Sequence, residues 1–225
     1  MTKNLHTPHQ SGELSLVLGV DGSGKSTFLN GLSERFGMAI LEPTSTPEAK
    51  AFKAAHIETP VDGPLIDRRE RIFLDLNRQF DQSVGAELDA GQNVATTGNG
   101  LVTLVSHGLM RVIVGERSPN EIDSAVQRWM ESDALKPDHV ALVHAPDDVI
   151  SERIQERQQA GDQTERFWGF NSPYFLSRYQ ETWHGVLDTL AQETVTQCVT
   201  LDSSQLRPDE MIDVYSGQGV RSSIQ

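Results

Sequence analysis

The stretch GVDGSGKST at residues 19–27 decides the fold class of this chain. It fits the Walker A pattern G-x-x-x-x-G-K-[ST], and it lies between an apolar run and a helical pattern, as a phosphate-binding loop requires. Glycines let backbone N–H groups turn inward around phosphates, and the N-terminus of the following helix adds positive potential. We therefore expect nucleotide phosphates to bind to Gly19, Asp21, Gly22, Ser23, Gly24, Lys25, Ser26 and Thr27.

Three side chains of this loop carry chemistry. Lys25 is expected to reach the transferred phosphate, and Ser26 is expected to bind Mg²⁺, with Asp21 as a second candidate metal ligand. ATP is the expected donor because the chain has no Asn-Lys-x-Asp sequence of the kind that recognises guanine. The competing interpretation is a Gly-rich turn with an exposed lysine, which the strand-loop-helix setting disfavours.

Short apolar runs alternate with longer helical patterns along the chain, which is typical of βαβ units around a parallel sheet. The pattern predicts one α/β domain over residues 13–215, between polar tails at 1–12 and 216–225, with a polar lid segment at about 157–171. The predicted strands are 14–20, 38–41, 93–97, 139–144 and 195–201, and the predicted helices are 25–35, about 66–90, about 147–159 and 173–192.

Composition excludes several classes of protein. The net charge of −13 repels nucleic-acid phosphates and anionic lipids, so non-specific DNA binding is not expected. Cys198 is the only cysteine, which excludes an intramolecular disulfide and a cysteine-based metal cluster and suits a reducing cytoplasm. The apolar runs fall far below the ~20 residues that cross a bilayer, and the polar start lacks the pattern of a signal peptide. We expect a cytoplasmic protein that does not span a membrane.

Several segments, in order, resemble those of thymidylate kinases. The P-loop with Asp21-Gly22-Ser23 is similar to theirs, and LEPTSTP at 41–47 resembles their Arg-Glu-Pro-Gly-Gly-Thr-Pro segment without its leading arginine. RIFLDLNR at 71–78 resembles the long helix whose arginine binds the acceptor nucleotide, a role that falls to Arg78 here. SPYFLSRY at 172–179 resembles the helix after the lid in both thymidylate kinases and deoxynucleoside kinases.

This resemblance spans about residues 14–187. It implies a three-layer P-loop kinase fold, with a five-stranded parallel sheet, helices on both faces and a lid. One departure follows the third predicted strand, where thymidylate kinases have Asp-Arg-Tyr and this chain has Thr97-Gly98-Asn99. An arginine for the acceptor phosphate and an aspartate on the magnesium side are therefore both absent from that place.

The remaining catalytic candidates lie in the lid and at a strand end. Arg157 and Arg166 are the expected transition-state cations, with solvated surface arginines as the competing interpretation. Glu42 follows the second strand, where parallel α/β sheets place ligands, and would take the proton of a hydroxyl acceptor. A phosphate acceptor needs no such base, and Glu42 as a structural cap is the alternative. Among the arginines of the long helix, ion pairs are expected for Arg68, Arg69 and Arg71, but not for Arg78.

Three functions remain open. The resemblance implies ATP- and Mg²⁺-dependent phosphoryl transfer to a pyrimidine deoxynucleotide. Glu42 and the departure at Thr97 motivate a hydroxyl acceptor instead, either a nucleoside or a 5-hydroxymethyl pyrimidine in phage DNA, although the net charge of −13 disfavours a DNA substrate. The third is a nucleotide-binding protein without turnover. The expected partner is a small-molecule acceptor, with modified DNA and a homodimer as further options.

Overall fold

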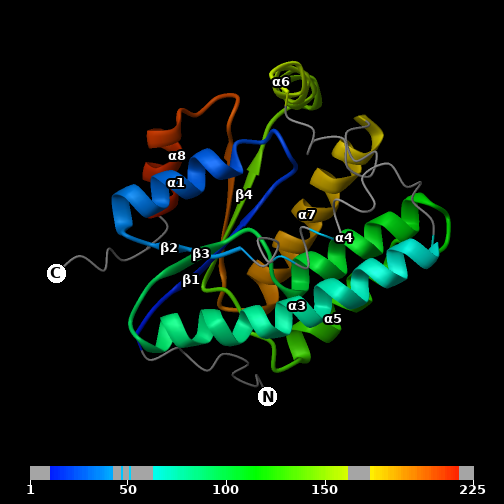
Figure 1. The fold of residues 1–225 in the computed structure, drawn as a ribbon, viewed down its shortest axis with the longest axis horizontal. Coiled ribbons are helices and arrows are strands. Elements are labelled where there is room, and N and C mark those ends of the chain that lie inside the picture. The colour runs from blue at the N-terminus through cyan, green and yellow to red at the C-terminus, as the bar shows by residue number, and fades with distance from the viewer. Residues whose placement is uncertain (1–10, 43–46, 48–50, 52–62, 162–172, 218–225) are drawn as a thin grey trace.

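The computed structural model describes residues 11–42, 47, 51, 63–161 and 173–217. These residues form a five-stranded sheet with the order β2-β3-β1-β4-β5, and each recorded strand pairing is parallel (Figure 1). The predicted five-stranded parallel sheet is confirmed. Its strands are β1 (Leu14–Leu18), β2 (Ala39–Ile40), β3 (Val94–Thr96), β4 (His139–His144) and β5 (Gln197–Asp202).

β1 and β4 lie at the centre of the sheet and are buried almost throughout. All five residues of β1 and the first five of β4 are buried. A parallel strand that helices cover on both faces needs a continuous apolar run rather than alternation, which is why LSLVL and HVALVH form these strands. The two strands are in register, with Val17 opposite Ala141.

Helices cover both faces of the sheet, so the three-layer α/β fold is confirmed (Figure 1). One core cluster packs α1 (Lys25–Phe36) and α8 (Pro208–Ser216) on one face. Another cluster packs four helices on the opposite face: α3 (Gly63–Asp89), α4 (Gly100–Ile113), α5 (Asn120–Glu131) and α7 (Pro173–Glu193). The seventh described helix, α6 (Asp147–Gln159), follows β4 beyond its carboxyl end.

The four predicted helices form with shifts of at most a few residues, but the sequence pattern did not predict α4, α5 and α8. α4 is rich in Gly and β-branched residues, which obscure a helical pattern. The residue that marks the start of α4 is its N-cap, Asn99, whose Oδ1 accepts a hydrogen bond of 3.1 Å from the Val102 amide. α8 begins with Pro208 as its first residue, another recognisable start.

None of the helices in the described ranges is both long and apolar enough to span a bilayer.

Candidate nucleotide-binding site

The loop between β1 and α1 has the backbone conformation of a phosphate cradle. Gly19, Gly22 and Gly24 have φ angles of 144°, 86° and 99°, which side-chain-bearing residues rarely adopt. A Cβ added at Gly19 would lie 2.3 Å from the carbonyl oxygen of Val143 and 2.5 Å from Ser23 Oγ. Only glycine fits there, and a turn of this kind can direct backbone N–H groups toward an anion.

Lys25 lies at the start of α1, where its ammonium group faces the loop. Its Nζ donates a hydrogen bond of 2.7 Å to the Val20 carbonyl and lies 3.6 Å from Asp21 Oδ1. The side chain of Lys25 is 17% exposed, whereas that of Asp21 is 67% exposed. A sheltered cation at the mouth of an anion cradle is what phosphoryl transfer requires.

The residues at the edge of the loop fit the expected magnesium ion. Ser26 and Asp21 are both exposed, and they offer one hydroxyl and one carboxylate. This sparse donor set suits Mg²⁺, which keeps several waters and binds to substrate phosphates more than to protein side chains.

Arg153 on α6 forms hydrogen bonds that connect the loop with the end of β5. Its Nη1 donates to the Gly22 carbonyl at 3.1 Å and to Ser203 Oγ at 2.9 Å, and its Nη2 donates to the Ser203 carbonyl at 3.0 Å. Ser203 directly follows β5. One guanidinium group therefore joins the loop, α6 and the end of β5.

On the other side of β1, Glu42 and Thr97 follow β2 and β3. Thr97 Oγ1 donates a hydrogen bond of 3.4 Å to Glu42 Oε1. Because β3 lies between β1 and β2, two strand spacings separate β2 from β1, which is about 10 Å. An acceptor above the end of β3 would therefore lie between Glu42 and the phosphate-binding loop.

The turn after β3 carries no cation. Thr96 Oγ1 donates to the Gly98 carbonyl at 3.0 Å, and Asn99 caps α4. Thr97, Gly98 and Asn99 therefore lead into α4 and carry no positive charge.

Arginines gather between the first turns of α3 and the last turns of α4. Arg111 on α4 forms ion pairs with Asp67 and with Glu70 on α3. Arg69 Nη1 donates to the sulfur of Met110 at 3.6 Å. These contacts hold two positive charges between two antiparallel helices.

Burial sets the charge states in this region. It lowers the pKa of Arg69 to about 10, against the charges of Tyr179 and Asp21, so the guanidinium stays protonated at neutral pH. Burial, with the charges of both arginines, lowers the pKa of His107 to about 3, despite its hydrogen bond to Thr103. His107 is therefore neutral and leaves the positive charge to the arginines.

Arg78 does not lie with the P-loop residues. Its side chain is 78% exposed and pairs with Asp75 at 2.8 Å. It lines a cavity of about 560 Å³ between α3, α4 and α5, and the described lining of that cavity includes Trp129 but no residue of the P-loop. The preceding residue, Asn77, is the one that faces α4, where its Nδ2 donates to Thr103 Oγ1 at 2.6 Å.

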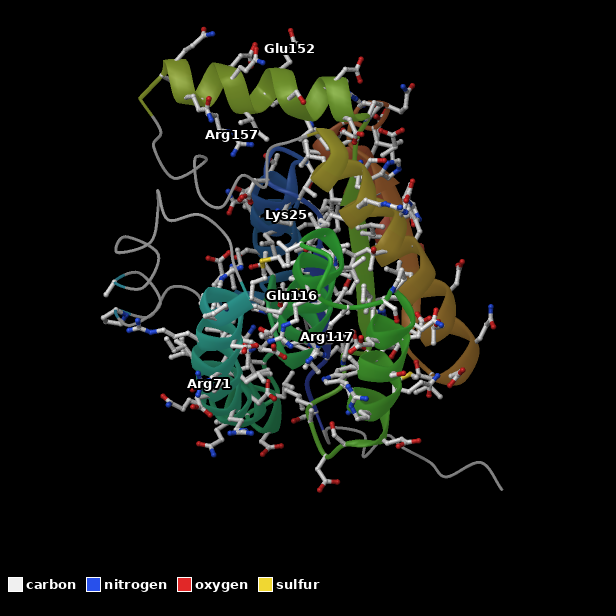
Figure 2. The ribbon with its side chains drawn as sticks, turned by 90° about the vertical axis from the view of Figure 1, so that its right-hand side faces the viewer. Lys25, Arg71, Glu116, Arg117, Glu152 and Arg157 are labelled. Atoms are coloured by element: carbon white, nitrogen blue, oxygen red, sulfur yellow. The ribbon has the colours of Figure 1, made fainter. Side chains whose placement is uncertain are left out.

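The lid candidates lie on and beyond α6. Arg157 is exposed in the last turn of α6. It extends from the side of α6 nearer to Lys25, whereas Glu152 points the opposite way (Figure 2). Arg166 lies outside the described residues, as does most of the segment after Glu42.

The sequence pattern did not predict that Arg153 contacts the loop, and it gave Arg111 no role. One feature of the sequence could have pointed to Arg153. It lies between Ile150 and Ile154, the buried residues of α6, and this position predicts that its side chain lies near the core. Nothing in the sequence pattern pointed to Arg111, because α4 itself was not predicted.

The comparisons with known proteins identify the fold. No family model matches this chain, and no curated protein matches it in sequence. Among solved structures, thymidylate kinase from Candida albicans is similar, with a TM-score of 0.67 and 18% identity over 96% of this chain and 97% of that chain. Deoxyadenosine kinase from M. mycoides with bound dATP has a TM-score of 0.63 and 12% identity, over 91% and 98%.

The fold is that of the P-loop nucleoside and nucleotide kinases. One of these two proteins is named for a nucleotide and the other for a nucleoside, and at such identities the likeness concerns the fold. The acceptor has to be argued from this chain's own residues.

Proposed function

We propose that this chain is a kinase that transfers the γ-phosphoryl group of ATP to a pyrimidine deoxynucleotide. The observation that carries the proposal is the position of Lys25, whose ammonium group is held 2.7 Å from the Val20 carbonyl at the mouth of the glycine cradle. Phosphoryl transfer depends on positioning and on neutralising charge, and this cation lies at the carboxyl end of the central strand, where open α/β sheets bind ligands.

On the donor side, backbone N–H groups of the cradle and the N-terminus of α1 would bind the ATP phosphates. Lys25 would turn from the Val20 carbonyl to a phosphate oxygen, and Ser26 would hold the magnesium ion. That ion, when bound, neutralises charge on the β- and γ-phosphates. Arg153 would keep the cradle in shape through its bond to Gly22.

In the transfer itself, the bond between the γ-phosphorus and the bridging oxygen of ADP breaks as a bond forms to an oxygen of the acceptor. A monophosphate is already ionised, so no proton has to be removed. Lys25 would neutralise the developing charge, and the lid arginines Arg157 and Arg166 would assist it. The products would be ADP and a nucleoside diphosphate.

A second candidate function is favoured by the contact between Thr97 and Glu42. The hydroxyl of Thr97 holds Glu42 at the end of β2, where a carboxylate would accept the proton of an acceptor hydroxyl as the new phosphate bond forms. The acceptor would then be a nucleoside or a 5-hydroxymethyl pyrimidine in DNA. The net charge of −13 argues against the polymer.

The test measures how fast the pure wild-type protein and the Lys25→Ala variant consume ATP in the presence of Mg²⁺. The acceptors are dTMP, the other monophosphates, thymidine, 5-hydroxymethyl-deoxyuridine and hydroxymethyluracil-containing DNA. Turnover with dTMP that Lys25→Ala abolishes is the expected result. Turnover with hydroxyl acceptors alone would support the second candidate, and ATP binding with no turnover would indicate a non-catalytic nucleotide-binding protein.

A further inference from the structure

We propose that the cavity between α3, α4 and α5 is a second ligand site, which binds a small neutral ring compound through a hydrogen bond from the indole N–H of Trp129. This site goes beyond the proposed transfer reaction, because it is separate from the P-loop. The cavity has a volume of about 560 Å³, which is in the usual range for sites of small organic molecules. It lies among three helices that pack on the same face of the sheet (Figure 1).

The indole nitrogen of Trp129 is a hydrogen-bond donor at the wall of this cavity. Trp129 is 4% exposed, and its buried Nε1 has no hydrogen-bond partner among the described residues. Trp129 and Gly100 both line the cavity, and a Cβ added at Gly100 would lie 3.6 Å from Nε1. The nitrogen therefore borders the space that Gly100 leaves open. A buried N–H without an acceptor is unfavourable, so a ligand that supplies an acceptor would be bound at a gain.

Lys136 holds the indole ring in this position. Its Nζ lies 4.2 Å from the centre of the Trp129 ring, and it donates to the carbonyls of Trp129 at 2.7 Å and of Ser132 at 3.0 Å. The ammonium group covers one face of the ring, which is a favourable cation–π arrangement. A ligand is therefore expected to meet the ring at its nitrogen edge, beside Gly100. Because the donor is already held in place, binding orders few further side chains.

The rest of the lining favours a neutral and largely apolar ligand. Apolar walls come from one side chain of each helix, namely Leu74, Leu104 and Ala125. The charged residues of the described lining are two arginines and two aspartates, whose formal charges cancel: Arg78, Arg128, Asp81 and Asp133. An anionic nucleotide gains no net attraction from such a set. A ring compound with one hydrogen-bond acceptor matches both the apolar walls and the single buried donor.

Much of this lining lies toward the edge of the sheet opposite the P-loop. Val84 and Leu88, in the part of α3 that follows the cavity, pack in one cluster with the first residues of β1 and β3. Leu135 packs against the same cluster and directly follows the last lining residue of the cavity. The P-loop instead follows the carboxyl end of β1, and no residue of the loop is in the described lining. ATP and a cavity ligand should therefore bind at the same time.

The test uses two probes of the same shape, pyridine and benzene, of which only pyridine has a hydrogen-bond acceptor. Each probe is titrated into the uniformly nitrogen-15-labelled protein at a slightly alkaline pH, where pyridine is uncharged. The indole N–H resonances and the backbone amide resonances of Gly100 and Ala125 are followed by NMR spectroscopy. The chain has three tryptophans, and the spectrum of Trp129→Phe identifies the indole resonance of Trp129.

We expect pyridine to move the Trp129 indole proton downfield until the shift saturates, because a hydrogen bond deshields the proton. Benzene should shift the amides of Gly100 and Ala125 without moving the indole proton downfield. Saturating ATP and Mg²⁺ should leave both titrations unchanged. Gly100→Leu should abolish the pyridine effect, because its side chain enters the cavity beside Nε1.

The matched control is Gly85→Leu on α3, where an added Cβ meets nothing within 4 Å, and it should bind pyridine as the wild-type protein does. Thermal unfolding checks that each variant is folded, and Gly100→Ala serves if Gly100→Leu is not. The absence of a saturable shift with pyridine, an equal downfield shift with benzene, or a shift that the filled cavity retains would overturn the site. Displacement of pyridine by ATP would also overturn it, since the probe would then occupy the nucleotide site.

Discussion

Gly19 determines the shape of the phosphate-binding loop through its φ of 144° and its approach to Val143. We expect Gly19→Ala to lower the free energy of unfolding by about 2 kcal/mol or more, because strain and a clash with a backbone carbonyl add together. ATP binding should be lost as well. Urea unfolding and nucleotide titration measure the two effects.

The matched control is Gly185→Ala in the exposed part of α7, where an added Cβ meets nothing within 4 Å. That variant should gain roughly 0.5–1 kcal/mol, since alanine is preferred to glycine in a helix. If Gly19→Ala is as stable as the control and still binds ATP, the cradle does not depend on this glycine.

A substitution of Glu42 distinguishes a phosphate acceptor from a hydroxyl acceptor. With a phosphate acceptor no base is needed, so Glu42→Gln should change kcat with dTMP by less than about threefold. With a hydroxyl acceptor the same substitution should lower kcat by about 10²- to 10⁴-fold. Steady-state kinetics with dTMP and with thymidine distinguish the two, and a large loss with dTMP would contradict our assignment.

At the residue scale, the sequence shows the P-loop motif directly, but it does not show which way each arginine of the long helix points. Successive helix residues point about 100° apart, so an offset of one position moves a side chain to another face. The motif resemblance selected Arg78 for the acceptor, and that role stays a prediction; in the structure Asn77 contacts α4 and Arg78 pairs with Asp75. The position of Arg69 depends on how α3 packs against α4. The local sequence of α3 does not determine that packing.

Among the elements, α6 is joined to the glycine-rich loop through Arg153. We expect Arg153→Gln to raise the KM for ATP by about tenfold, since its bonds to Gly22 and Ser203 would be lost. Binding of dTMP alone should not change. Glu152→Gln, on the side of α6 that points away from Lys25, is the control and should leave both values unaltered (Figure 2). Equal effects of the two substitutions would show that Arg153 acts only on helix stability.

The C-terminal half of α3 meets the segment before β4 at a pH-sensitive contact. Burial raises the pKa of Asp81 to about 6, against the opposing charge of Lys136 and a hydrogen bond from the Leu135 backbone. The folded state therefore holds this proton more tightly than the unfolded state, so the contribution of Asp81 to stability is present below pH 4 and is lost as the pH rises through 6.

We expect Asp81→Asn to remove this pH dependence. Relative to the variant, the wild-type protein should lose about 1–2 kcal/mol of stability between pH 4 and pH 7, a value reduced for the partial exposure of the carboxyl group. Urea unfolding at both pH values measures the difference. Parallel stability curves for the two proteins would show that Asp81 is not buried as the structure has it.

For the whole molecule, the strand order divides the site into two halves. β1 is central, with β4 and β5 on one side and β3 and β2 on the other. Arg153, which is also bonded to Ser203, contacts the loop from the first side, and Glu42 and Thr97 lie on the second. Donor and acceptor groups would thus meet at the switch point of the sheet, where open α/β folds bind ligands.

The sequence predicted the strands well because buried parallel strands are continuous apolar runs, and 139–144 was predicted without error. It did not predict the order of the strands. β2 has only two residues, and its place beside β3 depends on pairing between distant segments such as Ala39 with Val94. The proposed division into donor and acceptor halves therefore depends on the strand order of the folded chain.

The most direct test of the central claim follows the γ-phosphate of labelled ATP. The pure protein is incubated with γ-labelled ATP, Mg²⁺ and dTMP, and the products are separated. We predict label in the β-phosphate of dTDP, in amounts equal to the ADP formed, and none with Lys25→Ala. Label found only in inorganic phosphate, or retained in ATP, would contradict the assignment of this chain as a nucleotide kinase.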